Sequence, residues 1–118
     1  MTTIQKKHRD YVEEAIQLAQ KSTMIKQHGS VIVKDGEIIG KGYNYRVPNL
    51  KCTYSIHAEI DAILNAKKTC KNDFRDCILY VVRINNKKDL SQSLPCEKCN
   101  QFIIRHKIPK VYFSCKMI

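Results

Sequence analysis

The chain has 118 residues, 43% of them hydrophobic, and its 21 Lys and Arg against 11 Asp and Glu give a formal net charge of +10. This composition predicts one globular domain over residues 1–118, and the absence of a signal-peptide core and of an apolar run of about 18 residues predicts a cytoplasmic protein without membrane contact. The positive charge is typical of proteins with an acidic partner, such as a nucleotide phosphate, RNA or DNA, and equally of a basic surface that keeps a protein soluble.

The N-terminal third shows a helical pattern followed by a hairpin pattern. In residues 8–21 apolar side chains recur at helical spacing, so we expect a helix there. Two strand-like runs, 31–33 and 37–42, flank the pair Asp35-Gly36. Asp-Gly between such runs predicts a tight hairpin, because the turn requires positive φ.

The middle of the chain reads as a loop and a second helix. Residues 45–55 contain the breakers Pro48 and Asn49, which predict a loop. Residues 56–68 then have helical spacing, with Ser55 as the expected N-cap. The expected core residues of this helix are Ile60, Ile63 and Leu64.

The last third predicts a β-α-β unit. Residues 76–84 form a nearly continuous apolar run, which is typical of a strand buried on both faces. Pro95 suits the first position of a helix over 96–107, and residues 110–115 form a final short strand. Strands joined through a helix lie parallel, so the whole order α-β-β-α-β-α-β predicts a mixed sheet with an antiparallel hairpin at its edge and helices packed on it.

Cys96 and Cys99 are three residues apart at the start of the last predicted helix. Two thiolates at this spacing suit Zn²⁺, and a helix N-terminus favours the thiolate form that binds the metal. A redox pair is the alternative, although a thioredoxin-like arrangement would place the pair after an early strand. Without a secretory signal the other cysteines are expected to be free: Cys52, Cys70, Cys77 and Cys115.

His57 is the histidine best placed to join the two cysteines, because it begins a predicted helix after a loop. His8 and His106 lie among charged residues and are expected on the surface, while His28 is expected to be a structural turn residue. Glu59 lies in the same helical turn as His57, but at about 100° per residue their side chains point well apart. It is therefore placed to contact a water at an open fourth metal position, unless it only favours the helix dipole.

These two motifs, His-Ala-Glu at 57–59 and Pro-Cys-Glu-Lys-Cys at 95–99, resemble the signature of the zinc-dependent deaminases. Together with HGSVIV, GKGYN, IHAEIDAILNA and KVYFS they make the chain similar, from about Gln27 to Ser114, to the cytidine and deoxycytidylate deaminase superfamily, which includes the tRNA adenosine deaminases. The resemblance implies a cytidine-deaminase-like three-layer α-β-α fold with a mixed sheet, here without the family's C-terminal fifth strand and helix.

The resemblance also implies roles for individual residues. Glu59 becomes the proton shuttle of a hydrolytic deamination for which zinc supplies hydroxide. Asn44 and Ala58 become substrate contacts, although Asn44 taken alone reads as a turn residue at a strand end. The implied ligands of one Zn²⁺ per chain are His57, Cys96 and Cys99.

The resemblance favours a cytosine nucleotide as substrate, dCMP or CMP converted to dUMP or UMP with release of ammonia. Asn100 stands where free-cytidine deaminases commonly carry arginine, which argues against free cytidine. A tRNA adenosine-to-inosine deaminase is the alternative enzyme, and a non-catalytic zinc module that binds nucleic acid is the alternative of another class. Because the family is commonly oligomeric and strand 111–114 is apolar on both faces, we expect a homo-oligomer, at least a dimer.

Overall fold

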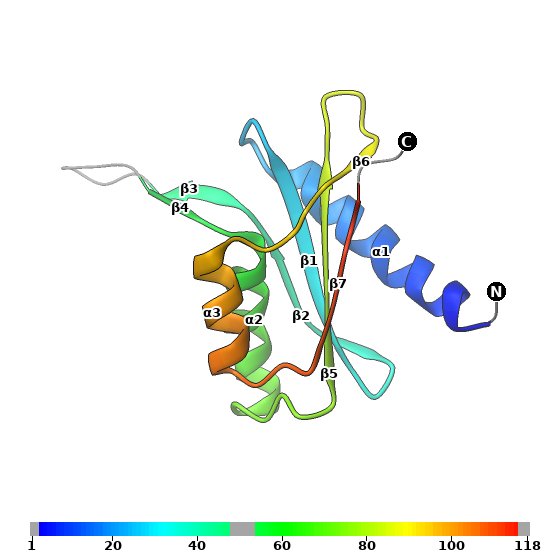
Figure 1. Cartoon of the computed structure of the whole chain (residues 1–118), viewed down its shortest axis with the longest axis vertical. Coiled ribbons are helices and arrows are strands. Elements are labelled where there is room, and N and C mark those ends of the chain that lie inside the picture. The colour runs from blue at the N-terminus through cyan, green and yellow to red at the C-terminus, as the bar shows by residue number, and fades with distance from the viewer. Residues whose placement is uncertain (1–2, 48–53, 116–118) are drawn as a thin grey trace.

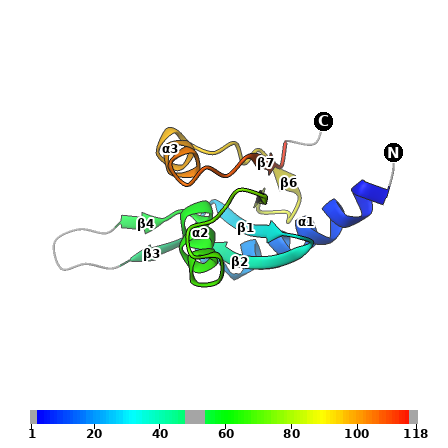
Figure 2. The ribbon, with the colours of Figure 1, turned by 90° about the horizontal axis from the view of Figure 1, so that it is seen from below.

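Two helical layers enclose a mixed sheet in the computed structural model, which describes residues 3–47 and 54–115 (Figures 1 and 2). The elements in chain order are α1 (Thr3–Lys21), β1 (Gln27–Lys34), β2 (Glu37–Tyr43), β3 (Tyr45–Val47), β4 (Tyr54–Ile56), α2 (Ala58–Cys70), β5 (Cys77–Ile84), β6 (Leu90–Ser91), α3 (Glu97–Arg105) and β7 (Lys110–Phe113). Helix α1 packs on one face of the sheet, and α2 and α3 pack on the other. The three-layer α-β-α prediction is therefore confirmed. In the described part of the chain, no helix combines the length and apolarity that crossing a bilayer requires.

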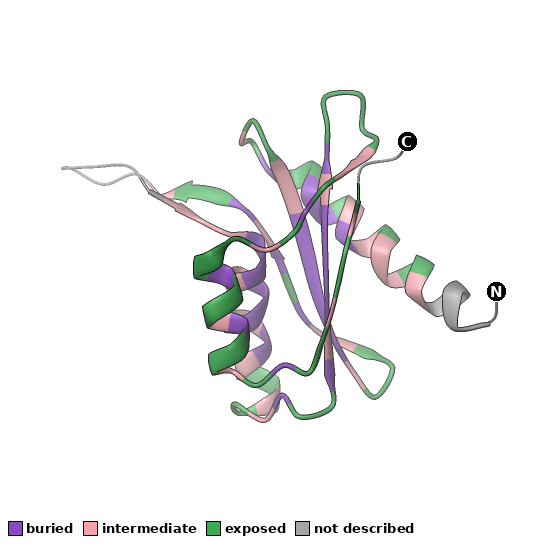
Figure 3. Cartoon of the chain, in the orientation of Figure 1, coloured by how far each residue is buried: buried purple, intermediate pink, exposed green. Residues whose placement is uncertain are grey.

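The main sheet has the strand order β2-β1-β5-β7, with the short β6 beside the end of β5. The predicted hairpin joins β1 and β2 at Asp35 and Gly36, whose φ angles of 52° and 79° are both left-handed. Strand β5 is antiparallel to β1 and parallel to β7, which confirms the β-α-β unit. As its continuous apolar run predicts, β5 is buried or half-buried along its whole length (Figure 3).

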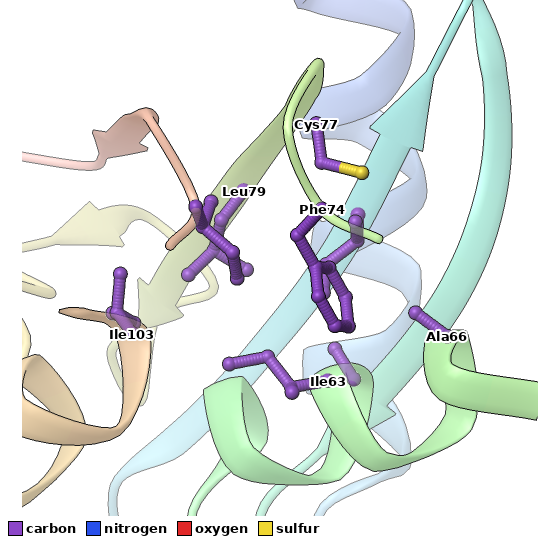
Figure 4. Close-up of a cluster of buried hydrophobic side chains, with 9 residues drawn as sticks. Ile63, Ala66, Phe74, Cys77, Leu79 and Ile103 are labelled. Carbon is purple, nitrogen blue, oxygen red and sulfur yellow. The ribbon is translucent and has the colours of Figure 1, made fainter. Parts of the chain in front are cut away.

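Separate hydrophobic clusters fill the two faces of the sheet. On the α1 face, Ala15, Leu18 and Ala19 pack against Val31 of β1 and Tyr80 of β5. The other cluster joins α2 and α3 to β5 (Figure 4), and its labelled members are Ile63, Ala66, Phe74, Cys77, Leu79 and Ile103. Because β5 contributes to both clusters, it holds the helices on both faces in place.

Strand β2 approaches helix α2 too closely for any side chain between them. A Cβ atom on Gly40 would lie 2.5 Å from the carbonyl oxygen of Ala62, and one on Gly42 would lie 2.5 Å from that of Ala58. The helix correspondingly turns its small alanines to the sheet. This approach fixes the height of the first turn of α2 above the sheet.

The tight packing explains an error in the predicted core of α2. Ile63 is fully buried, as expected, but Ile60 is only half-buried and Leu64 is 45% exposed. Ala62 and Ala66 occupy the sheet-facing positions instead, because only small side chains fit above the glycines of β2. Side-chain hydrophobicity was therefore the wrong guide to the buried face.

The segment expected to be a loop, 45–55, contains two paired strands. Strands β3 and β4 form an antiparallel ladder that projects from the body of the domain beside α2 and α3 (Figure 1). The aromatic and β-branched residues of these strands, such as Tyr45 and Val47, suit a ladder. Pro48, Asn49 and Cys52 lie outside the described residues.

Both helices on the second face begin one or two residues from where we expected. His57 is the N-cap of α2, so Ser55 lies in β4 and is not the cap. Cys96, whose backbone is extended, is the N-cap of α3, so Pro95 precedes the cap instead of occupying the first helical position. Among the described residues, neither cap side chain hydrogen-bonds to its own helix. Helix α3 also ends earlier than predicted, and Lys107 beyond it has a φ of 60°.

The two histidines expected on the surface instead pack against aromatic rings. His8 hydrogen-bonds through Nδ1 to the Tyr80 hydroxyl, and its ring lies 4.7 Å from that of Tyr112. The ring of His106 lies 4.4 Å from that of Phe102. Charged neighbours in the sequence hid these contacts because the rings come from other strands or from the preceding helical turn. Cys70, Cys77 and Cys115 are free, as predicted.

Candidate metal centre and active site

The N-terminal ends of α2 and α3 bring three potential metal ligands together. His57 caps α2, Cys96 caps α3, and Cys99 lies one turn further along α3. One ligand atom from each residue lies within 4.8 Å of the other two. The structure therefore assembles the three residues that the sequence suggested, although β5 and more separate them along the chain.

The spacing of these donor atoms suits a tetrahedral zinc site. Nδ1 of His57 lies 3.1 Å from Sγ of Cys99 and 3.6 Å from Sγ of Cys96. Zn–S bonds of about 2.3 Å and Zn–N bonds of about 2.0–2.1 Å at tetrahedral angles separate nitrogen and sulfur by about 3.6 Å. The Cys96 distance matches this value, and the Cys99 distance is somewhat shorter. An imidazole and two thiols thus fit zinc in both chemistry and spacing.

The surroundings of Cys99 disfavour a thiolate in the absence of a cation. Burial, and then the neighbouring Glu59 carboxylate, raises the pKa of the Cys99 thiol above its ordinary value. A divalent cation bound to the sulfur would oppose both effects, because it stabilises the thiolate and balances the carboxylate. A bound metal ion would therefore allow a Cys99 thiolate and the Glu59 carboxylate to lie close together.

Glu59 lies beside the three potential ligands without being one of them. The group of mutually close donor atoms consists of His57, Cys96 and Cys99. The Glu59 side chain belongs to the first turn of α2 and is only 4% exposed. Burial raises the pKa of its carboxyl, while its own backbone N–H, His57 and Cys99 lower it in part. A buried carboxylate of raised pKa is a better proton acceptor than an exposed one.

A cavity of about 460 Å³ adjoins this group and is lined in part by His57, Glu59 and Cys96. Its size is in the range of small-molecule sites. Asn44 and Ala58, the two expected substrate contacts, line it as well. The structure thus places all six predicted site residues in or directly beside one cavity.

Asn44 fixes the wall of the cavity through its side-chain amide. Its Oδ1 accepts a hydrogen bond from the backbone N–H of His28 at 2.8 Å, and its Nδ2 donates to the carbonyl of Lys26 at 2.6 Å. An amide nitrogen carries two N–H donors, so one of them is left for a ligand. Asn44 therefore joins β2 to the start of β1, in agreement with its reading as a strand-end residue, while it also faces the cavity.

Three cavity residues were missed or misread in the sequence. His28 lies in β1, not in a turn, and lines the cavity together with Lys26 and Arg46. The alternation of side chains in β1 could have indicated the position of His28. Ile32 packs in the cluster with α2, and a strand residue four positions away lies on the same face of the sheet. Lys26 and Arg46 gave no local signal, since basic residues are spread along the chain. Among the described residues that line the cavity, Glu59 is the only carboxylate.

The sequence is similar to those of known proteins over most of its length. Residues 5–115 match the family model described as the cytidine and deoxycytidylate deaminase zinc-binding region. A probable deoxycytidylate deaminase from Caenorhabditis elegans is 34% identical over 103 residues, which cover 74% of this chain and 46% of that protein. A tRNA-specific adenosine deaminase from Streptococcus pyogenes is 34% identical over 108 residues, covering 88% of this chain and 60% of that protein. The chain thus spans about half the length of the curated relatives it matches.

The fold has similar counterparts among solved structures. A guanine deaminase from Bacillus subtilis superimposes with a TM-score of 0.66 at 28% identity, over 92% of this chain and 64% of that one. The match of the family model extends over both ligand-bearing helix starts and over the strand between them. This chain therefore belongs to the cytidine and deoxycytidylate deaminase family.

Proposed function

We propose that this chain, as a single deaminase domain, hydrolyses the exocyclic amino group of a cytosine nucleotide and converts dCMP or CMP to dUMP or UMP with release of ammonia. One observation carries the proposal. His57, Cys96 and Cys99 form a group whose donor atoms are spaced as zinc ligands are. The buried Glu59 carboxylate lies in the cavity beside this group and is not part of it. Three protein ligands that leave a fourth position open are typical of catalytic zinc sites.

The residues of the cavity divide the chemistry among them. Zinc held by the three ligands would lower the pKa of a water molecule and provide hydroxide near neutral pH. Glu59 would take a proton from this water and pass it to the ring nitrogen of the base. It would then take the remaining proton of the added hydroxyl group and give it to the amine, which leaves as ammonia. Its burial supports this role, because the raised pKa brings its proton affinity closer to that of the groups it serves.

Two further groups are suited to orient the substrate. Asn44 has one amide N–H left to donate, and its other polar groups are held rigidly by β1. Ala58 is the first residue of α2, where backbone N–H groups lack an acceptor within the helix. Both groups can donate hydrogen bonds to oxygens of a base or a sugar in the cavity.

The charge of the cavity supports a phosphate-bearing substrate. Lys26 and Arg46 line it, and Glu59 is the only acidic residue that the structure describes there. A nucleoside, which carries no anionic group, would gain less from these cations than a nucleotide. The relationship to a tRNA-specific adenosine deaminase favours a second candidate, deamination of adenosine in a structured RNA. Arg46 lies on the projecting β3–β4 ladder, where it could contact a polymer.

A deamination panel with a matched pair of variants tests the proposal. The substrates are cytosine, cytidine, deoxycytidine, CMP, dCMP, guanine and adenosine in a tRNA anticodon stem. We expect dCMP or CMP to be preferred. Glu59→Gln should keep its zinc and its fold but lose activity by on the order of a hundredfold or more. Glu13→Gln, on the exposed side of α1, should change nothing.

Three outcomes of this experiment would contradict parts of the proposal. Turnover of adenosine in RNA alone would replace the cytosine nucleotide by the second candidate. Loss of zinc from Glu59→Gln would make Glu59 a ligand. Bound zinc without turnover of any compound in the panel would favour a non-catalytic module that binds nucleic acid.

We also propose that the chain forms a homo-oligomer. In the described part of the chain, β7 pairs only with β5. Its residues Tyr112 and Phe113 are both exposed large hydrophobic side chains. Unpaired strand edges with apolar side chains invite association. Light scattering at micromolar concentration tests this, and an active species of 13.7 kDa would contradict it.

A further inference from the structure

Arg83 of β5 is the cross-strand neighbour of His28, a residue that lines the cavity. It stands directly opposite His28 in the β1–β5 ladder, so the two side chains emerge side by side. Leu79, four residues earlier in β5, packs in the cluster under α2 and α3, whereas Tyr80 packs under α1. Because strand residues alternate between faces, Arg83 projects to the side of α2 and α3, where the potential metal ligands lie.

The guanidinium of Arg83 has no partner in the described part of the chain. Its Nε is buried without a hydrogen-bond acceptor, and none of the ion pairs between described residues includes it. Its backbone N–H is satisfied separately, by Oγ of Ser114 at 3.1 Å. The residue as a whole is half-buried, but its Nε is withdrawn from solvent, and an unsatisfied buried donor calls for an explanation. An anion supplied from outside the chain would provide one.

The neighbours of Arg83 direct this unpaired charge toward the cavity. His28 lines the cavity, and its Nδ1 lies 3.3 Å from the carbonyl oxygen of Lys26, to which it donates. Burial first, and the charge of Arg83 among the further causes, lower the pKa of His28, in keeping with their closeness. The guanidinium of Arg83, which is always charged, therefore places a cation beside the cavity wall at His28. Lys26 and Arg46 are exposed, so water can satisfy them as it cannot satisfy the buried Nε of Arg83.

We propose that Arg83 binds a phosphate ester of the substrate beside His28 and so determines selection of nucleotides over nucleosides. This proposal rests on the proposed function. A phosphate bound at Arg83 selects a substrate only if the base of that same molecule reacts at Glu59. A guanidinium suits this role, since its planar fork of N–H donors can bind two phosphate oxygens at once. The same chemistry could come from the terminal phosphate of a mononucleotide or from an internucleotide phosphate.

The first test compares kcat/KM for dCMP and for deoxycytidine. Arg83→Gln should lower the value for dCMP by about ten- to a hundredfold, the effect of losing a hydrogen bond to a charged group, mainly through KM. The value for deoxycytidine should stay within about twofold. Arg83→Lys should recover part of the loss, because it keeps the charge without the fork. Arg105→Gln, which removes an exposed charge at the far end of α3, is the matched control.

An equal loss for dCMP and deoxycytidine in Arg83→Gln would overturn the proposal, because it would indicate a structural role. If Arg83→Gln does not fold, the same ratio measured on Arg83→Lys decides. A single-stranded oligonucleotide with one internal cytosine separates the two phosphate sources. Loss confined to dCMP assigns the terminal phosphate, and loss on the oligonucleotide assigns an internucleotide phosphate.

Calorimetric titration with dUMP and deoxyuridine separates this proposal from the proposed function, because it needs no turnover. We expect the wild type to bind dUMP more tightly than deoxyuridine, and Arg83→Gln to lose most of this preference. If Arg83→Gln loses the preference for dUMP but the wild type deaminates no cytosine compound, the phosphate site is supported and the proposed deaminase function is contradicted. An active enzyme whose preference for dUMP survives Arg83→Gln would overturn the phosphate site alone.

Discussion

Gly42→Ala should disturb the metal site although residue 42 supplies no ligand. A Cβ atom there would lie 2.5 Å from both the carbonyl oxygen of Ala58 and the nitrogen of Ala62. Ordinary contact begins at 3.4 Å, so strand and helix must separate by about 0.9 Å, the difference of the two distances. The obstructing atoms are backbone, so no change of rotamer can relieve the contact. The turn that must move is the one that His57 caps.

The expected effect has two parts. Overpacking of this kind costs about 1–3 kcal/mol of unfolding free energy, and the lower entropy of the unfolded alanine chain offsets about 0.4–1 kcal/mol of it. Movement of His57 also spoils the 3.1 and 3.6 Å spacings to the two sulfurs. Displacing a supporting element of a metal site lowers metal affinity by about ten- to a hundredfold.

Urea unfolding of the metal-free protein measures the first part, and competition for zinc with a chromophoric chelator measures the second. Gly36→Ala is the control, because its φ of 79° makes alanine strained while no atom lies within 4 Å of the added Cβ. It should cost about 1 kcal/mol and leave zinc affinity unchanged. Wild-type zinc affinity in Gly42→Ala would refute the reasoning, because the first turn of α2 would then not depend on the strand beneath it.

Three further predictions concern the metal, the cavity wall and the aromatic cluster under α1. Cys96→Ala should lose most of the one zinc per chain that elemental analysis should find in the wild type. Asn44→Ala should lower the unfolding free energy by about 1–3 kcal/mol in urea, because it leaves the N–H of His28 without its partner. Burial raises the pKa of Tyr80 to about 12, above about 10 for an unfolded chain, so its contribution to stability is present below pH 10 and is lost as the pH rises toward 12. Unfolding curves at pH 8 and pH 11 should therefore differ more for the wild type than for Tyr80→Phe.

Each of these predictions has a result that would contradict it. Full zinc retention in Cys96→Ala would exclude Cys96 as a ligand, with Cys115→Ala as the control for removing an exposed thiol. Unchanged stability of Asn44→Ala would mean that water replaces its hydrogen bonds. An equal alkaline loss in the wild type and in Tyr80→Phe would place the titration elsewhere.

The sequence predicted the features that depend on local patterns. Asp35-Gly36 fixes its hairpin through the φ angles of two adjacent residues, and the apolar run 77–84 reports burial on both faces by itself. The spacing of Cys96 and Cys99 likewise needs only one helical turn. The motif with His57 and Glu59 was readable because each residue lies in a recognisable helix start, and its meaning came from resemblance to a family.

The features that the sequence did not predict depend on contacts between distant segments. The buried face of α2 follows from glycines in β2, about twenty residues away, so Leu64 looked like a better core residue than Ala62. His28 and Arg83 become neighbours only through the register of β1 with β5. No short stretch of the chain contains that register.

At the two helix caps, helix stability and the metal binding that we propose favour different residues. Serine, threonine, aspartate and asparagine are the best N-caps, and each stabilises a helix start by about 1 kcal/mol relative to alanine. Helices α2 and α3 begin instead with His57 and Cys96, whose side chains make no cap hydrogen bond in the described structure. His57→Ser and Cys96→Ser are therefore substitutions by which the metal-free fold would gain stability while the proposed zinc site loses an imidazole and a thiolate. The residues that selection for stability alone would favour at these two positions are ones with which the site could not hold zinc as we propose.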